Sequence, residues 1–192
     1  MRAQSKNIRV LVVGCGNMGA SHAMAYKMLD GVEICGIVST GSSKEVLNQK
    51  LGGGYPLYNE YDEALEATQP DAVCISTYPD THEQFAILAL EKGCHVFIEK
   101  PLADSVSGAE RVAAAAKKAG KKLVVGYILR HHPSWEKFIE LARQLGKPLV
   151  MRMNLNQQSH GLMWNVHRNL MKSLSPIVDC GVHYIDVMCQ MV

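Results

Sequence analysis

Short apolar runs alternate with longer amphipathic stretches along the chain up to about residue 125. The runs are rich in Val and Ile and nearly continuous, which is the pattern of parallel strands that are buried on both faces. They predict strands at Ile8–Val13, Glu33–Val38, Tyr55–Tyr58, Ala72–Ser76, His95–Ile98 and Leu123–Val125. Helical patterns separate these runs, at 19–29, 43–51, 61–68, 81–92 and 105–119. Strands that alternate with helices in this way predict an α/β fold built on a doubly wound parallel sheet.

The pattern changes after residue 126. Pro133–Leu145 has the spacing of an amphipathic helix, and Leu149–Asn156 alternates like a long strand. Residues 157–175 are polar without a clear period and are expected to form a loop, whereas Pro176–Met191 is again helical in pattern. One strand cannot form a sheet, so we expect 127–192 to be the start of an incomplete α+β domain. Either the chain is truncated or a partner supplies the missing strands.

A glycine-spaced turn follows the first predicted strand and opens the first predicted helix. Its pattern is G-x-G-x-x-G at Gly14, Gly16 and Gly19, with Asn17 and Met18 inside it. In a strand–turn–helix–strand unit this pattern indicates a dinucleotide pyrophosphate site. The first glycine allows the tight turn, the second a close approach of backbone to phosphate, and the third close packing of helix on strand. The alternative is a glycine-rich turn in some other α/β protein.

The end of the second predicted strand bears on which dinucleotide is bound. NAD-preferring domains carry a carboxylate there, which holds the ribose hydroxyls. This strand instead ends in Ser39, Thr40 and Ser42, followed by Lys44. Hydroxyl donors and a positive charge without a carboxylate favour the 2′-phosphate of NADP over NAD. The alternative is that Ser39 contacts an adenosine ribose while Lys44 is solvated.

Two further segments follow buried strands, at the sheet edge where ligands bind in open α/β sheets. Thr77–His82 lies after the fourth strand, and His82 either faces the nicotinamide or makes local hydrogen bonds in the first turn of a helix. Glu99 and Lys100 lie after the fifth strand. A lysine there is a candidate acid or base if burial lowers its pKa. The alternative is an ordinary surface pair on a loop.

Asp179 and His183 form a third candidate pair. Their i,i+4 spacing places them on one face of a helix, where a carboxylate can fix the tautomer of an imidazole and raise its basicity. The alternative is an acidic residue that favours the helix dipole beside a buried histidine.

Composition and charge exclude several other classes of function. The net charge of +2 comes without a basic tract, so no nucleic-acid surface is expected. No apolar stretch is long enough to span a bilayer, and the N-terminus lacks the apolar core of a signal peptide. The six cysteines show neither a C-x-x-C pair nor metal-ligand spacing. We therefore expect a cytoplasmic protein without a metal site, in which Cys35, Cys74 and Cys94 are buried as small hydrophobic side chains.

Taken together, the motifs resemble those of the Gfo/Idh/MocA family, which includes glucose–fructose oxidoreductase and inositol 2-dehydrogenase. The resemblance rests on G-C-G-N-M-G at 14–19, T-Y-P-D-T-H at 77–82, G-C-H-V-F-I-E-K-P at 93–101 and D-C-G-V-H-Y-I-D at 179–186. It implies that Lys100, Asp179 and His183 form the catalytic group and that the Lys100–Pro101 peptide is cis. It also places Tyr127 and Arg130 near the cofactor.

The motifs and the family resemblance together predict a Rossmann-type NAD(P)-binding domain over 1–126. The start of a substrate and oligomerisation domain is expected over 127–192. The expected cofactor-binding residues are Gly14, Gly16, Asn17, Met18, Gly19, Ser39, Thr40, Lys44, Thr77, Tyr78, Pro79, His82, Glu99, Lys100 and Arg130.

The resemblance predicts an oxidoreductase that transfers a hydride between NADP or NAD and a hydroxyl or carbonyl of a sugar or cyclic polyol. Family members are about twice this length, and their second domain supplies much of the substrate pocket and of the oligomer interface. The full-length protein is therefore expected to be a homodimer or homotetramer. The alternative is a truncated, non-catalytic dinucleotide-binding module. A methyltransferase with a similar glycine turn is disfavoured by the E-K-P and D-x-G-x-H motifs.

Overall fold

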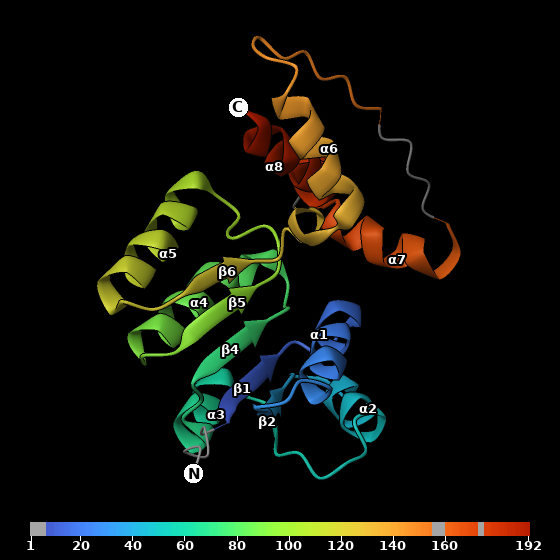
Figure 1. Ribbon diagram of the computed structural model, residues 1–192. Coiled ribbons are helices and arrows are strands. Elements are labelled where there is room, and N and C mark those ends of the chain that lie inside the picture. The colour runs from blue at the N-terminus through green and yellow to red at the C-terminus, as the bar shows by residue number, and fades with distance from the viewer. Residues whose placement is uncertain (1–6, 155–159, 173–174) are drawn as a thin grey trace. The chain divides into compact units, whose positions relative to one another are not determined.

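The computed structural model describes residues 7–154, 160–172 and 175–192 (Figure 1). The chain forms two compact units, Met1–Gly126 and Tyr127–Val192.

The first unit is built on one six-stranded sheet (Figure 1). Its strands are β1 (Ile8–Val13), β2 (Val32–Val38), β3 (Leu57–Tyr58), β4 (Ala72–Ile75), β5 (His95–Ile98) and β6 (Leu123–Val125). They lie in the order β3-β2-β1-β4-β5-β6, and every neighbouring pair is parallel. This is the strand order of the Rossmann fold, so the predicted fold class is confirmed.

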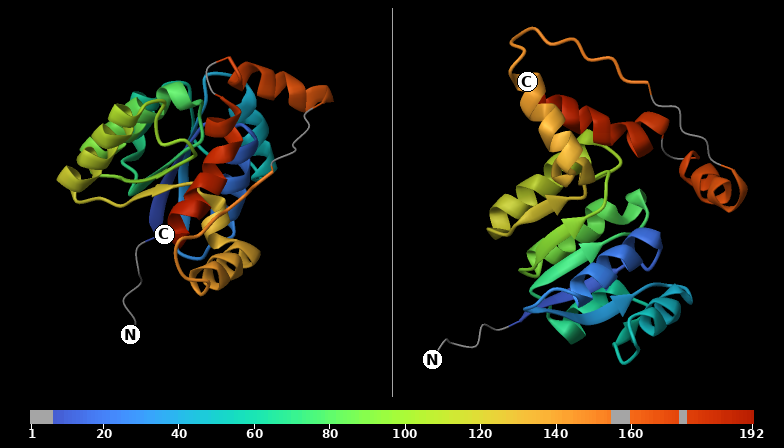
Figure 2. Two further views of the ribbon diagram at one scale, coloured as in Figure 1. Left: turned by 90° about the horizontal axis from the view of Figure 1, so that it is seen from above. Right: turned by 45° about the vertical axis from the view of Figure 1, so that its right-hand side comes forward.

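Helices cover both faces of this sheet (Figures 1 and 2). They are α1 (Asn17–Lys27), α2 (Ser43–Lys50), α3 (Tyr61–Thr68), α4 (Pro79–Glu91) and α5 (Val106–Ala119). One apolar cluster joins α1 and α2 to one face, and a larger cluster joins α3, α4 and α5 to the other. Leu11, Ile37 and Ile98 are fully buried in these clusters. Full burial of such a side chain contributes about 1.5–3 kcal/mol to folding.

Helix ends in this unit follow local sequence signals. Pro79 occupies the first turn of α4, where its missing N–H leaves no bond unmade. The Ser105 hydroxyl caps α5 by accepting a 3.1 Å hydrogen bond from the amide of Gly108. The same helix ends at Gly120, whose φ of 64° is left-handed. These signals bring the observed ends of α4 and α5 within two residues of those expected.

The regular elements in the described part of the second unit are all helices. Its elements are the 3₁₀-helix η1 (Ile128–His131), α6 (Pro133–Arg143), α7 (Gly161–Leu170), the π-helix η2 (Ile177–Gly181) and α8 (Val182–Met191). The buried side chains of Ile139, Ala142, Val187 and Met191 form its small core between α6 and α8.

Two sequence-based expectations for the second unit are wrong. No strand forms over residues 149–154, which is the described part of the strand expected at Leu149–Asn156. Leu149 and Met151 instead pack against the core of α6 and α8, while Val150 is 97% exposed. The loop expected over 157–175 contains helix α7, and its residues 155–159 and 173–174 lie outside the described part. The helix expected over Pro176–Met191 forms, but its first turn is the π-helix η2.

Candidate functional site

The glycine turn between β1 and α1 is shaped by two contacts that leave no room for side chains. A Cβ on Gly14 would collide with the backbone of Ser76, and Gly14 has a φ of 91°. A Cβ on Gly19 would overlap the carbonyl oxygen of Gly14. A Cβ on Gly16, in contrast, would meet no protein atom of the described chain within 4 Å. Gly14 and Gly19 therefore serve packing, whereas Gly16 keeps an open space beside the backbone.

The N-terminus of α1 offers donors for an anion next to this open space. Within the described residues no side chain caps the helix at Gly16, and its first turn holds no acidic residue. The first amides of a helix lack intrahelical partners, and the helix dipole adds a partial positive charge. Asn17 and Met18 belong to this first turn, and both are exposed. This arrangement fits the pyrophosphate of a dinucleotide.

The loop between β2 and α2 carries the residues expected at the adenosine ribose. Ser39 Oγ and Ser43 Oγ lie 2.8 Å apart in a hydrogen bond, and Thr40 is exposed. Lys44 is only 8% exposed, and its Nζ donates a 2.9 Å hydrogen bond to the carbonyl oxygen of Gly41. Its nearest carboxylate oxygen is Glu45 Oε1, at 3.5 Å.

Burial of Lys44 argues against the alternative in which this side chain is solvated. Its charge also reaches the glycine turn. Burial raises the pKa of the Cys15 thiol to about 11, and the positive charge of Lys44 opposes that rise. The loop therefore presents hydroxyls and a buried cation, and the β2 end itself carries no carboxylate.

The turn after β4 is ordered by its own hydroxyl groups. Thr77 Oγ1 and Thr81 Oγ1 lie 2.7 Å apart, and Thr81 also donates to the carbonyl oxygen of Tyr78 at 2.8 Å. Tyr78 precedes α4 and is exposed, and Pro79 opens the helix. Because Gly14 touches the backbone of Ser76, this turn lies directly beside the glycine turn.

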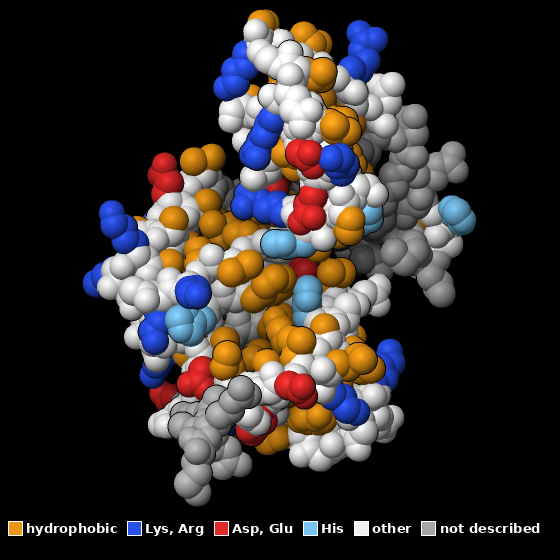
Figure 3. All heavy atoms as spheres, in the orientation of Figure 1, with side chains coloured by type: hydrophobic (Ala, Val, Ile, Leu, Met, Phe, Trp, Pro, Cys, Tyr) orange, Lys and Arg blue, Asp and Glu red, His pale blue; other side chains and the backbone are white. Residues whose placement is uncertain are grey.

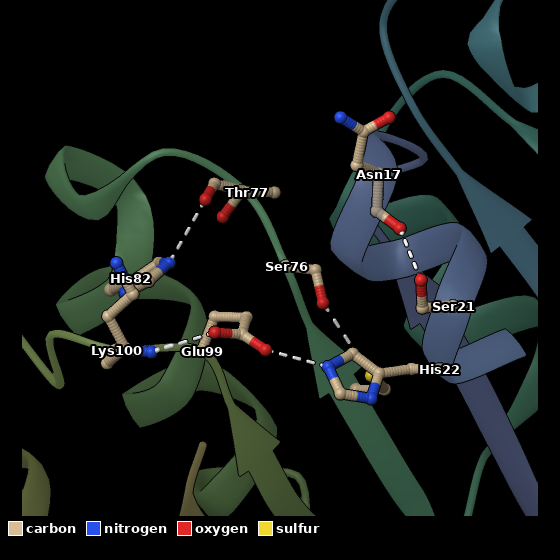
Figure 4. A network of polar contacts seen from close by, with 9 residues as sticks. Asn17, Ser21, His22, Ser76, Thr77, His82, Glu99 and Lys100 are labelled. Atoms are coloured by element: carbon tan, nitrogen blue, oxygen red, sulfur yellow. Dashed lines mark hydrogen bonds and ion pairs between the residues drawn. The ribbon is translucent and has the colours of Figure 1, made fainter. Parts of the chain in front are cut away.

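His82 is fully buried in the first turn of α4. Its Nδ1 lies 2.7 Å from the carbonyl oxygen of Pro101. Its Nε2 lies 3.2 Å from the carbonyl oxygen of Thr77, a contact drawn in Figure 4. Burial lowers the pKa of the imidazole, although the two carbonyl contacts oppose this effect. These contacts favour local hydrogen bonding over a nicotinamide contact as the role of this side chain. They tie the turn after β4 to the peptide that follows Lys100.

Glu99 and Lys100 lie at the carboxyl end of β5 (Figure 4). The Glu99 side chain is turned inward, where its Oε1 lies 2.7 Å from Nε2 of His22 on α1. Its Oε2 accepts a 3.3 Å hydrogen bond from the backbone amide of Lys100. The Lys100–Pro101 peptide is cis, as the resemblance implies. Desolvation raises the pKa of the Glu99 carboxyl, but the hydrogen bonds and charges of His22 and Lys100 together outweigh it, so the pKa lies below its usual value.

His22 was not among the residues predicted for the site. It lies three residues after Gly19, so the two share the face of α1 that meets the sheet. Its ring also packs edge-on against Phe97, with centroids 4.7 Å apart. The i,i+3 spacing from a close-packed glycine is the only sequence signal that could have identified it.

Asp179 and His183 lie in the second unit, at the junction of η2 and α8. Asp179 is 6% exposed, and Cys180 Sγ donates to its Oδ2 at 3.6 Å. His183 lies in the first turn of α8, and its ring meets that of Tyr127 edge-on, with centroids 6.4 Å apart. The structure therefore brings Asp179 and His183 onto one continuous helical segment, whereas Lys100 belongs to the first unit. Short π-helical turns inside helices are frequent at functional sites.

Arg130 forms a bidentate ion pair with Asp186, which lies one turn after His183. Its Nε and Nη2 lie 2.8 and 2.5 Å from the two carboxylate oxygens. Its guanidinium also lies over the Tyr127 ring, 5.3 Å from the centroid. The hydrogen bonds to Asp186 raise the pKa of Arg130 above its usual value. Arg130 thus binds α8 through both oxygens of Asp186, a contact that we call the Arg130 clamp. The family resemblance places Arg130 near the cofactor and does not predict this ion pair.

Other kinds of site find little support in the described chain. No group of three or more His, Cys, Asp or Glu side chains among the described residues could hold a metal ion. None of the described helices has both the length and the apolar character needed to cross a membrane. On the face drawn in Figure 3, the Lys and Arg side chains lie singly or in small groups.

Comparison with known proteins identifies the family. The model of the oxidoreductase family with an NAD-binding Rossmann fold matches residues 8–127. A 4-carboxy-2-hydroxymuconate-6-semialdehyde dehydrogenase from a Sphingobium species is 31% identical over 83% of this chain and 54% of its own length. An inositol 2-dehydrogenase/D-chiro-inositol 3-dehydrogenase from Shouchella clausii is 29% identical over 94% of this chain and 52% of its own. The chain thus spans about half the length of these curated relatives.

Solved structures of nicotinamide-dependent proteins also resemble this chain. An NAD-binding protein from Listeria innocua matches 97% of this chain and 55% of its own, with a TM-score of 0.78 and 26% identity. A 3-ketoreductase from Actinomadura kijaniata, solved with NADP and TDP-benzene, matches 72% of this chain and 43% of its own, with a TM-score of 0.65 and 27% identity.

Proposed function

This chain belongs to the Gfo/Idh/MocA oxidoreductase family with its NAD-binding Rossmann fold, and on that premise we propose that it acts in a nicotinamide-dependent dehydrogenase or reductase. The proposed substrate is a hydroxyl or carbonyl group of a sugar or cyclic polyol. An inositol dehydrogenase and a 3-ketoreductase among its relatives support this substrate class. Because the chain spans about half of its curated relatives, activity and substrate are proposals for the whole protein.

The observation that carries the proposal is the shape of the glycine turn. Gly14 and Gly19 pack too closely for any side chain, while Gly16 keeps an open space beside a helix N-terminus. Both features are what a bound pyrophosphate needs. We place the cofactor there, with the turns after β2, β4 and β5 along its length.

The proposed chemistry divides among three residues. When bound, NAD(P) supplies the hydride acceptor or donor. His183 acts as general acid or base at the substrate hydroxyl, and Asp179 orients it or binds a neighbouring hydroxyl. Lys100 polarises the carbonyl and helps to relay the proton. The burial of Asp179 and its place on the helical segment of His183 support this assignment.

The cofactor is proposed to be NADP in preference to NAD. A buried Lys44 beside Ser39 and Ser43 offers charge and hydroxyl donors, and no carboxylate ends β2 to repel a 2′-phosphate. Burial of an ammonium is costly unless an anion pairs with it, and a 2′-phosphate would provide that pairing more strongly than Glu45 at 3.5 Å.

The proposal also covers the oligomeric state and the cellular location of the full-length protein. We propose a homo-oligomer, a dimer or a tetramer, for the full-length protein, in line with the family resemblance. We propose a cytoplasmic location because the cysteines are all free thiols and Cys35, Cys74 and Cys94 are buried, as expected in a reducing compartment.

Two measurements on the same preparation test this function. NADPH and NADH are titrated by fluorescence, and a panel of inositols, sugars and keto-sugars is screened for absorbance change at the nicotinamide band. Binding together with turnover supports the proposal. Binding without turnover on any substrate would select the non-catalytic dinucleotide-binding module, and absence of binding would refute both.

A further inference from the structure

The contact between His22 and Glu99 joins two parts of the first unit that lie far apart in the sequence (Figure 4). His22 belongs to the helix whose N-terminus is the proposed pyrophosphate site, and Glu99 directly follows the strand that leads to Lys100. Their side chains are 19% and 8% exposed, and the contact measures 2.7 Å. A charge-assisted hydrogen bond of this length in a sheltered place is stronger than an ordinary surface ion pair.

The Glu99 carboxylate is held on its other sides as well. Its second oxygen accepts from the Lys100 backbone amide at 3.3 Å. A Cβ on Gly126, at the end of β6, would lie 3.2 Å from Oε1, which is tighter than ordinary packing allows. One buried carboxylate thus meets His22 of α1, the amide of Lys100 and Gly126, the residue after β6. Its position is determined by all three, and so is the direction in which the chain leaves β5.

Apolar side chains also join α1 to the sheet, and Tyr26 adds a side-chain hydrogen bond with Cys74 of β4. Ala23 is buried against the sheet, and Gly19 touches Gly14. Apolar packing is not directional, so it permits small displacements of a helix along its axis. A directional bond from His22 to Glu99 would restrict such a displacement. A dinucleotide that reaches from the N-terminus of α1 to the end of β5 needs these two points at a set separation.

We propose that His22 and Glu99 are positioning residues that hold the pyrophosphate helix and the Lys100 end of β5 in register, so that one dinucleotide contacts both. This inference rests on the proposed cofactor site. It differs from direct cofactor binding by Glu99, because the carboxylate faces His22 and the Lys100 amide rather than the open space at Gly16.

The whole dinucleotide should depend on the His22–Glu99 contact, whereas its adenosine half alone should not, and this difference can be tested. Parent, His22→Ala and His22→Gln chains are titrated by calorimetry with NADPH and with 2′,5′-ADP, which carries only the adenosine half. If NADH binds the parent more tightly, NADH and ADP are used instead. The His22→Gln side chain keeps an N–H donor of similar reach. Arg111→Ala is the control, because it removes the ion pair that the exposed Arg111 of α5 forms with Glu83 of α4.

His22→Ala is expected to weaken NADPH binding about tenfold and 2′,5′-ADP binding less than about twofold, because only the spanning ligand needs the register. His22→Gln is expected to recover most of the affinity, and Arg111→Ala to change neither ligand. Equal weakening of both ligands would reduce His22 to a structural role and overturn the inference. An unchanged NADPH affinity, or a His22→Gln chain as weak as His22→Ala, would also overturn it. A parent that binds neither NADPH nor NADH would instead refute the proposed function itself.

Discussion

Two buried side chains hold the backbone on either side of Lys100. Glu99 accepts from the Lys100 amide, and His82 contacts the carbonyl oxygen of Pro101 at 2.7 Å. Both side chains are almost fully buried, so their contacts are sheltered from competing water. Neither residue needs to touch a ligand in order to matter for the reaction. Each determines how the backbone on one side of Lys100 is held.

Replacing His82 is expected to change how stability depends on pH. Burial lowers the pKa of His82 in the folded chain. Below about pH 6.5 this imidazole therefore binds a proton in the unfolded chain that it does not bind in the folded chain. Stability therefore falls as the pH decreases from 7.5 to 5.5, by at most about 1.4 kcal/mol per pH unit for one proton. His82→Gln is expected to be less stable at pH 7.5 but to show a smaller fall. Urea unfolding at both pH values measures this.

The exposed His131 provides the control for that experiment, since His131→Gln should leave the fall unchanged. A fall in the His82→Gln chain as large as in the parent would show that folding does not lower the pKa of His82.

Ser39 is where cofactor preference can be reversed. Ser39→Asp places a carboxylate against a 2′-phosphate and offers an acceptor to a ribose diol instead. NADPH affinity is expected to drop about tenfold or more, while NADH affinity is maintained or rises. Fluorescence titration with both cofactors gives the two affinities, and the uncharged Ser39→Asn chain separates charge from size. Equal affinity of the parent for NADPH and NADH would refute the preference.

At the level of elements, the strands of the first unit were predictable because each is a continuous apolar run. A central parallel strand is buried on both faces, so its sequence carries little ambiguity, and β1, β5 and β6 have the predicted bounds. β3 is shorter than expected: it begins at Leu57, and at the sheet edge only β2 pairs with it. The glycine turn was predictable because its spacing and its place after β1 match the pattern of a dinucleotide-binding turn.

The second unit was harder to predict because an alternating pattern has more than one structural solution. Leu149 and Met151 face a core made by α6 and α8, which satisfies the alternation without a neighbouring strand. Helix α7 was missed because its sequence mixes Asn and His with apolar residues and has no clear capping signal. The pairs His22–Glu99 and Arg130–Asp186 join residues 77 and 56 positions apart, a separation that no local pattern reveals.

Helix α8 is expected to depend on its ion pair with Arg130. Asp186 is buried and holds the guanidinium by both oxygens. Asp186→Asn removes the charge with little change of shape, and it is expected to destabilise α8 by about 1–2 kcal/mol. Amide hydrogen exchange along α8 measures the loss. The exposed pair of Glu140 with Lys137 serves as the comparison. If Glu140→Gln lowers protection of α8 as much as Asp186→Asn does, the clamp is not specific.

At the level of the whole molecule, the two units contribute different parts of the proposed chemistry. The first unit holds the glycine turn, the ribose loop and Lys100, and the second unit holds Asp179 and His183. The proposal therefore assigns cofactor binding to the first unit. It assigns turnover to residues of both units, and the curated relatives are about twice as long as this chain.

The central claim is that a dinucleotide binds at the glycine turn, and Gly16→Ala tests it most directly. An added Cβ at Gly16 meets no atom of the described chain within 4 Å, and its φ of −70° suits an alanine, so folding should be unaffected. The same Cβ would occupy the space assigned to the pyrophosphate. The measurement is a fluorescence titration of NADPH and NADH into the parent, Gly16→Ala and, as a control at the opposite end of the same helix, the exposed Met28→Ala. The account predicts saturable binding by the parent and by Met28→Ala, and at least about tenfold weaker binding by Gly16→Ala with an unchanged unfolding midpoint. A Gly16→Ala chain that binds both cofactors as tightly as the parent would contradict it.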